Sequence, residues 1–450
     1  MGEMDAAMQA DETPRVTVTL ITRQEKTLLR PTGSRRHAVF SLRANLEQAP
    51  REPVAEPVAE PRRPLTMALT LDRSGSMAGD ALHMAKQVAI ALVDGMTEQD
   101  EIAVVIFDDK IETLQELAPV TPAVKQHVHR ALAQVKARGS TALHEAWLTS
   151  CNMLASDHLQ ANRLARCYLL TDGQANVGET DVETIATQAA GVRENAGVGT
   201  SAFGLGDDYN ERLLGPWAVA GGGQFHDLGK LADLADTFLG ERDDLRAVVA
   251  LRTRLEVEMA EGMEAETISA YWRADGANRH TLRWRLDIGD LLNGGERNVV
   301  VRFSFPKEDK AYSYTARARV VWIDGRGEQT SPWQSITFTY GSEQACSDEP
   351  RDSQAMRAIG LAHADRAKRQ ALELSAHHDS DGALWLIHQT IARIGDYANG
   401  DTELLAAISD LHALEATIRA HKLTAREAKE AYFAQQTRSR GQRDYRKPPM

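Results

Sequence analysis

The stretch LTMALTLDRSGSM, residues 65–77, joins an apolar segment of strand length to a polar turn rich in serine and glycine. A short apolar run followed at once by residues that favour turns and helix starts predicts a buried strand that leads into a helix. The next segment supports this interpretation, because Leu82, Ala85, Ala89 and Leu92 fall on one helical face.

The same alternation of apolar strands and amphipathic helices continues to about residue 240. Strands that alternate with helices predict an α/β fold with a doubly wound, mostly parallel sheet. The expected strands are 65–71, 102–107, 164–171, 199–205 and 223–227, and the expected helices are 79–96, 121–138, 142–158, 180–196 and 230–239.

Strands without intervening helices flank this region on both sides. Residues 15–22 and 37–44 alternate apolar and polar side chains, and about six further strands occupy residues 245–341. The simplest architecture is one β-sandwich into which the α/β domain is inserted, followed by a C-terminal α-helical region. The expected domains are 1–64 (N-terminal sandwich strands and a Pro-Glu linker), 65–242 (α/β domain), 243–345 (β-sandwich), 346–437 (helical region) and 438–450 (basic disordered tail).

The composition argues against several classes of protein. A formal charge of −12 disfavours general binding to nucleic acid or to anionic membranes. The first residues do not resemble a signal peptide, and no apolar stretch approaches membrane-spanning length. The cysteines Cys151, Cys167 and Cys346 are widely spaced, which predicts neither a disulfide framework nor a zinc site. We therefore expect a cytoplasmic protein.

Three polar loops are expected to meet at one edge of the predicted sheet. The loop DRSGS (72–76) follows the first strand, GST (139–141) enters a helix, and TDG (171–173) follows the strand that ends in YLLT. The carboxyl ends of parallel strands form the crevice in which open α/β sheets bind ligands. The structural alternative is that these residues only cap helices and make an ordinary turn.

The three loops resemble the metal-ion-dependent adhesion site of von Willebrand factor type A (VWA) domains, and the resemblance covers residues 65–240. It suggests a bacterial protein of the intracellular type. The resemblance implies that the side chains of Asp72, Ser74, Ser76, Thr141 and Asp172 hold the metal. Two carboxylates and three hydroxyls offer only oxygen atoms, which suit Mg²⁺ or Mn²⁺ and not zinc.

The resemblance implies binding and not catalysis. In the family, an acidic residue of a partner typically completes the metal shell. We therefore expect a Mg²⁺-dependent protein–protein binding module or scaffold whose protein partner offers an Asp or Glu. The bacterial context suggests a kinase, phosphatase or AAA+ ATPase system as the source of that partner. The C-terminal helices are either a second contact surface or a packed helical cap.

Two other functions stay open. The first is a secreted or surface adhesin. A signal peptide, an anchor or paired cysteines would favour this function, and we find none of these in the sequence. A metal-assisted hydrolase would need a general base beside the ion, for which Asp207 and His144 are the candidates. Asp207 lies in GLGDDYN (204–210), and such a loop more often only caps a helix.

Overall fold

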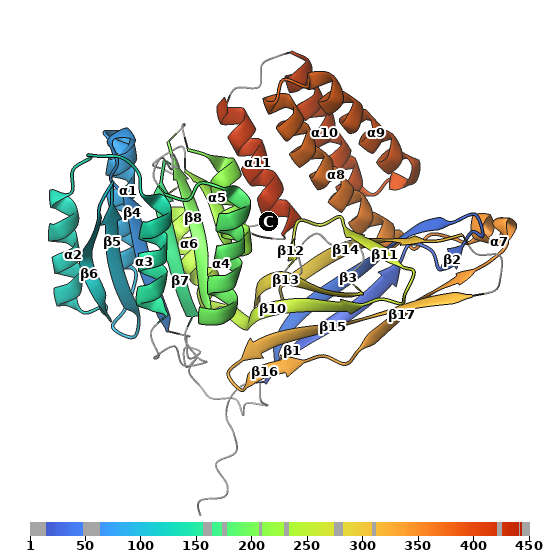
Figure 1. The fold of residues 1–450 in the computed structure, drawn as a ribbon, viewed down its shortest axis with the longest axis horizontal. Coiled ribbons are helices and arrows are strands. Elements are labelled where there is room, and N and C mark those ends of the chain that lie inside the picture. The colour runs from blue at the N-terminus through green and yellow to red at the C-terminus, as the bar shows by residue number, and fades with distance from the viewer. Residues whose placement is uncertain are drawn as a thin grey trace, which may run out of the picture.

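The chain folds into an α/β domain, a β-sandwich and a group of C-terminal helices. Figure 1 shows the α/β domain at one end, the sandwich at the other and the helices above the junction between them. The computed structural model describes residues 15–47, 64–155, 164–172, 178–206, 209–228, 234–273, 282–307, 312–420, 425–440 and 442.

The α/β domain is built on a six-stranded sheet with the order β6-β5-β4-β7-β8-β9. All neighbouring strands run parallel except β6, which pairs with β5 in the antiparallel direction at the edge of the sheet. The strand β4 is buried along its whole length because strands flank it on both sides and helices cover both faces of the sheet. The strands are β4 (Leu65–Asp72), β5 (Glu101–Phe107), β6 (Ile111–Pro119), β7 (Leu164–Thr171), β8 (Val198–Leu205) and β9 (Gly222–Leu228).

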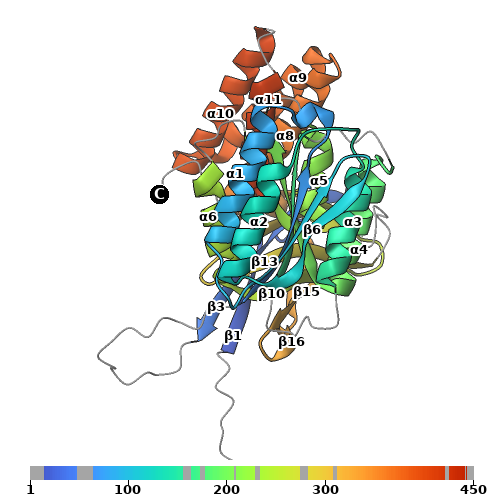
Figure 2. The same ribbon diagram turned by 90° about the vertical axis from the view of Figure 1, so that its left-hand side faces the viewer.

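Helices cover both faces of this sheet, as expected for a doubly wound fold. Figure 2 shows α1, α2 and α6 on one face and α3 and α4 on the other. The apolar side chains divide in the same way, into one core under α1, α2 and α6 and another under α3, α4 and α5. The helices are η1 (Gly75–Met77), α1 (Asp80–Asp94), α2 (Pro122–Gln134), α3 (Leu143–Leu154), α4 (Val182–Ala196), α5 (Glu211–Ala220) and α6 (Leu234–Arg246).

The sandwich combines strands from both sides of the α/β domain. One sheet has the order β1-β3-β14-β11, and within it β3 pairs with β14, so that Phe40 lies opposite Val299. The α/β domain is therefore inserted into the sandwich. The first sheet contains β1 (Arg15–Gln24), β3 (Ser34–Glu47), β14 (Glu296–Phe305) and β11 (Glu264–Thr267), and the second contains β12 (Trp272–Arg273), β13 (Arg283–Leu292), β10 (Val248–Glu258), β15 (Ser313–Asp324), β17 (Gln334–Tyr340), β2 (Leu28–Leu29) and β16 (Gly327–Thr330).

The C-terminal helices pack on the sandwich and on the α/β domain. The long helix α8 contacts β3 and β14 through a small apolar core that includes Val39, Val300 and Ile359. The last helix, α11, lies between α8 and the α/β domain, where it contacts α5 and β9 (Figure 1). The helices are α7 (Glu343–Asp348), α8 (Ser353–Ala376), α9 (Ser380–Ala398), α10 (Thr402–Arg419) and α11 (Ala425–Ser439).

The segment expected as a basic tail begins inside the folded structure. Helix α11 continues to Ser439. The next residue, Arg440, is buried, and its guanidinium donates a hydrogen bond to the backbone carbonyl of Gly223. Residues 443–450 lie outside the described residues. No helix in the described part of the chain is long and apolar enough to cross a membrane.

Candidate metal centre

Two of the expected ligands lie at the ends of neighbouring parallel strands. Leu71 of β4 is in register with Leu170 of β7, so Asp72 and Asp172 leave the sheet at the same edge. The Thr171 hydroxyl donates a 2.6 Å hydrogen bond to Oδ2 of Asp72. The sheet itself thus brings the two carboxylates of the expected metal site together.

The loop after β4 adds two hydroxyl groups. The backbone N–H of Ser74 donates to Oδ1 of Asp72 at 2.7 Å, which fixes the carboxylate from the side opposite Thr171. The hydroxyl oxygens of Ser74 and Ser76 lie 3.1 Å apart, because the short helix η1 folds the chain back at Gly75. Ser74 is buried and Ser76 is exposed, so this loop extends from the buried carboxylate to the surface.

Backbone hydrogen bonds hold the loop of Thr141 against the loop after β4. The N–H of Gly75 donates to the Gly139 carbonyl at 3.1 Å, and the N–H of Arg138 donates to the Arg73 carbonyl at 2.8 Å. Thr141 is buried, directly before the start of α3. The loop of Thr141 is therefore tied to the loop after β4.

The tight course of this loop depends on Gly139. Its φ is +73°, and an added Cβ would lie 2.3 Å from Oδ1 of Asp109 and 3.0 Å from Cβ of Asp108. A side chain at position 139 would have to displace the Asp109 carboxylate and would crowd the buried side chain of Asp108. The left-handed φ and the close approach to Asp108 thus favour glycine at this position.

A buried carboxylate, which was not predicted from the sequence, holds the same loops together through two arginines. Asp108 accepts hydrogen bonds from Arg73 at 2.9 Å and from Arg138 at 2.7 Å. Burial acts to raise the pKa of Asp108, but the bonds and charges of Arg138 and Arg73, with a bond from the Lys110 N–H, lower it overall. The signal in the sequence was an aspartate pair directly after an apolar strand, FDD at 107–109.

Asp72 lies in an environment that disfavours its negative charge. Burial raises the pKa of Asp72 to about 6, and the nearby charge of Asp172 acts in the same direction. Hydrogen bonds from Thr171 and Ser74 oppose this shift but do not cancel it. A cation between the two carboxylates would remove this penalty, because an opposite charge favours the ionised form.

Two of the expected ligand atoms have no hydrogen-bond partner. Oγ1 of Thr141 and Oδ1 of Asp172 are buried, and neither makes a hydrogen bond. Buried oxygen atoms of this kind are costly unless something binds them. The expected set has two carboxylates and three hydroxyls, and this all-oxygen set fits a hard divalent cation. It differs from a cluster of three or more His, Cys, Asp or Glu, and no such cluster that could hold a metal occurs among the described residues.

Of the two candidate general bases, the described part of the chain includes His144, whose ring is engaged by other side chains. His144 is buried against Trp147 and Trp217. Its Nε2 forms a hydrogen bond with the side chain of Gln188. Asp207 lies outside the described residues. The end of its segment does cap a helix, since the Asn210 side chain accepts hydrogen bonds from the first residues of α5.

Comparison with known proteins connects the α/β domain to one family. The model of the von Willebrand factor type A domain matches residues 67–174. The uncharacterized protein YfbK from Escherichia coli is 25% identical over 319 residues, which are 65% of this chain and 54% of YfbK. The uncharacterized protein sll0103 from Synechocystis is 28% identical over 177 residues, 39% of this chain and 40% of sll0103. The chain thus spans less than two thirds of each of these relatives.

Human inter-alpha-trypsin inhibitor heavy chain H3 is 31% identical over 127 residues, which are 27% of this chain and 14% of that protein. Two solved structures resemble nearly the whole chain. A von Willebrand factor type A protein from Catenulispora acidiphila has a TM-score of 0.66 at 18% identity, with 89% of this chain and 90% of that chain covered. The ArnB paralog VWA2 from Sulfolobus acidocaldarius has a TM-score of 0.57 at 17% identity, with coverages of 94% and 98%. At these identities the likeness shows a shared fold. Strand order, family match and structural likeness together identify the α/β domain of this chain as a von Willebrand factor type A domain.

Proposed function

We propose that the chain is a Mg²⁺-dependent protein-binding module. Asp72, Ser74, Ser76, Thr141 and Asp172 would hold Mg²⁺ or Mn²⁺, and an Asp or Glu of a protein partner would fill the remaining position. When bound, the ion supplies a positive centre that attracts a carboxylate. VWA domains are typically protein–protein interaction modules, which supports binding as the general role.

One observation carries this proposal. The unpartnered oxygen atoms of Thr141 and Asp172 belong to different loops, and both loops meet the loop of Asp72 at the carboxyl edge of the sheet. Caps and turns alone would satisfy these atoms within their own loops. Oxygen atoms left without hydrogen bonds in loops held together by long-range contacts are better explained by a shared ligand.

The makeup of the expected shell supports a role in binding a carboxylate. With three neutral hydroxyls and one of the two carboxylates acting through water, the ion would keep part of its charge and attract a further anionic oxygen. Ser76 is exposed, whereas Asp72 and Thr141 are buried, so a partner would approach from the side of Ser76. The same features favour a binding site over a hydrolase, since His144 is engaged with Gln188 and two tryptophans.

Calorimetric titration with Mg²⁺ and Mn²⁺ tests the metal site. Asp72→Ala and Asp172→Ala should abolish binding while circular dichroism shows an intact fold. Asp109→Asn is the matched control, because Asp109 is an exposed carboxylate on the adjacent loop and is not an expected ligand. If both alanine variants bind the ion as the wild type does, the site assignment is wrong.

A second experiment tests the partner. The wild-type chain and Asp172→Ala are used as bait in a bacterial cytosolic extract, each with Mg²⁺ and with chelator. A protein retained only by the wild type with Mg²⁺ supports the proposal, and its identity tests whether a kinase, phosphatase or AAA+ ATPase system is involved. A set of captured proteins that is indifferent both to the metal and to the substitution contradicts it.

We also propose that the chain acts in the cytoplasm and not as a surface adhesin. Cys151, Cys167 and Cys346 are all buried and free. Free cysteines agree with a reducing compartment, in which disulfides are rare. Fractionation of cells that produce the chain tests this proposal, and recovery from the cell surface would overturn it.

A further inference from the structure

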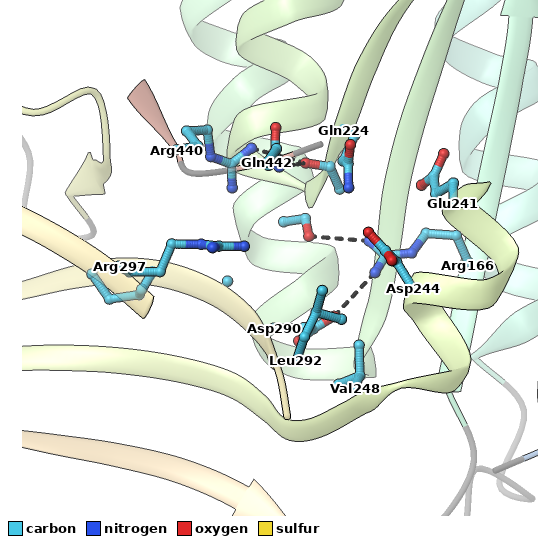
Figure 3. Close-up of a pocket in the computed structure, with 14 residues that line it drawn as sticks. Arg166, Gln224, Glu241, Asp244, Val248, Asp290, Leu292, Arg297, Arg440 and Gln442 are labelled. Atoms are coloured by element: carbon cyan, nitrogen blue, oxygen red, sulfur yellow. Dashed lines mark hydrogen bonds and ion pairs between the residues drawn. The ribbon is translucent and has the colours of Figure 1, made fainter. Parts of the chain in front are cut away.

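A cavity of about 100 Å³ lies where the VWA domain, the sandwich and the end of α11 meet. Its wall takes Arg166 from β7, Arg297 from β14 and Arg440 from the residue after α11. Figure 3 shows Arg166 and Arg297 reaching into the space from opposite sides, with Arg440 above it. Three guanidinium groups from three parts of the molecule thus surround one cavity.

Arg440 is the most unusual of the three. It is only 4% exposed, and its guanidinium donates through Nη1 to the Gly223 carbonyl at 2.8 Å. Its Nε has no hydrogen-bond partner, and no described carboxylate forms an ion pair with it. Burial lowers the pKa of Arg440 to about 10, and the nearby Tyr271 and Asp287 offset this effect only in part.

Arg166 also keeps an unused donor. It is 3% exposed and donates to the Gly222 carbonyl at 3.1 Å and to Asp290 at 3.0 Å, but its Nε has no partner. Asp290 does not neutralise Arg166 alone, because it also pairs with Arg193 at 3.5 Å. The cavity therefore contains buried guanidinium donors in excess of the acceptors that the protein supplies.

The carboxylates in the wall are already in use. Glu241 accepts hydrogen bonds from Ser201 at 2.5 Å and from His226 at 2.6 Å, and Asp290 is shared between two arginines. Asp244 also has an interaction partner. None of these acids is left over to balance Arg440.

We propose that this cavity is a binding site for a phosphate anion. The planar guanidinium group matches a tetrahedral oxyanion better than any other cation in proteins, because two N–H groups donate in parallel. The volume is enough for a few water molecules or for one compact oxyanion. The anion would accept the unused Nε–H of Arg440 and the guanidinium of Arg297, and so connect α11, the VWA domain and the sandwich. Its source is either free inorganic phosphate or the phosphate group of a small ester.

Thermal unfolding and calorimetry of the full chain test this proposal. Potassium phosphate is compared with potassium chloride at equal ionic strength, and glycerol phosphate is the second probe. The wild type should bind with saturation and unfold at a higher temperature with phosphate. Arg440→Gln and Arg297→Gln should each weaken binding about tenfold or more, because each removes a charge-assisted hydrogen bond.

The matched control is Arg283→Gln, since Arg283 lies on β13 of the same sandwich with a side chain that is 79% exposed. It should bind phosphate as the wild type does. Without phosphate, Arg440→Gln should be at least as stable as the wild type, because it removes an unbalanced buried charge. If that variant does not fold, Arg297→Gln decides the question, because Arg297 is only partly buried.

Tighter binding of glycerol phosphate than of inorganic phosphate would identify an ester as the ligand, and the reverse would identify the free ion. The proposal fails if neither probe changes the unfolding temperature beyond the effect of chloride. It also fails if the two cavity variants respond to phosphate as Arg283→Gln does. Neither result depends on Mg²⁺, so the test is separate from that of the metal centre.

Discussion

Arg426 of α11 donates to both carboxylate oxygens of Asp227 on β9, and each hydrogen bond is 2.8 Å long. Asp227 is buried and also accepts the hydroxyl proton of Tyr209 at 2.7 Å. Lys429, one turn along the same helix, donates to the Tyr209 carbonyl at 2.5 Å. A largely buried ion pair thus fastens the C-terminal helix to the VWA domain, between residues that are 199 positions apart.

Arg426→Gln should lower the free energy of unfolding by about 3 kcal/mol, because it leaves the Asp227 carboxylate buried without its cation. Glu430→Gln is the matched control, since it removes the half-exposed partner of the same arginine and should cost less than about 0.5 kcal/mol. Urea denaturation measures both losses. Equal losses would mean that the Asp227 pair stabilises the fold no more than a surface ion pair does.

Asp72→Asn should stabilise the metal-free protein by about 1–3 kcal/mol, since burial raises the pKa of Asp72 to about 6 and its ionised form is disfavoured at pH 7. The amide oxygen can still accept from the Ser74 N–H, and the NH₂ group can donate to the Thr171 hydroxyl. Mg²⁺ should raise the urea midpoint of the wild type and leave that of the variant unchanged. A variant less stable than the wild type in chelator contradicts this account.

Gly139→Ala should weaken Mg²⁺ binding about tenfold or more in calorimetry, since the added Cβ would crowd the Asp108 side chain, which holds the loop of Thr141 through Arg138. Gly294→Ala is the control: its φ is also +73°, but no atom lies within 4 Å of the added Cβ. Both variants should lose about 1 kcal/mol to backbone strain. Only Gly139→Ala should change the affinity, and unchanged affinity there would exclude this loop from the site.

Acid should destabilise the chain through His363, which is buried on α8 with its ring edge-on to His37 of β3. Burial lowers the pKa of His363 to about 3, and nearby positive charges, first that of His37, act in the same direction. The unfolded chain takes up this proton near pH 6.5, so stability is lost as the pH falls below that value. The loss at pH 5 should be about 2 kcal/mol.

His363→Gln should therefore flatten the dependence of the urea midpoint on pH between pH 7 and pH 5. His377→Gln, at the exposed end of the same helix, should keep the slope of the wild type. The same slope in all three proteins would assign the acid sensitivity to other groups.

The sequence predicted those elements whose apolar pattern is continuous. The strands β4, β5 and β7 are almost fully buried, so each one appears as an apolar run. The buried strands β8 (VGTSAFGL) and β9 (GGQFHDL) were also predicted, although each has fewer apolar residues. The edge strand β6 was not predicted, because none of its residues is fully buried and its sequence IETLQELAP has no apolar run. Helix α5 was not predicted either, since Gly215 and Pro216 disfavour a helix. The helix forms nevertheless, because it buries Leu214 and Trp217.

The expected metal ligands came from three short segments, each with a local pattern. The contacts that hold those segments together are not local: Asp108 joins Arg73 to Arg138, and Thr171 bonds to Asp72. Arg440 shows the same limit, because its basic surroundings in the sequence predict an exposed tail, whereas in the structure it is buried in a cavity wall. Charge patterns along a chain do not tell which arginine the tertiary fold encloses.

The pairing of β3 with β14 also sets an order of events during synthesis. After Phe40 has been synthesised, the ribosome must continue to Val299 before the β14 partner of β3 exists. At typical rates of synthesis this takes on the order of tens of seconds. All strands of the VWA sheet lie within Leu65–Leu228, so that domain can fold during this interval. During this interval the β1–β3 hairpin has one strand edge and one apolar face uncovered, and both features favour aggregation of the nascent chain.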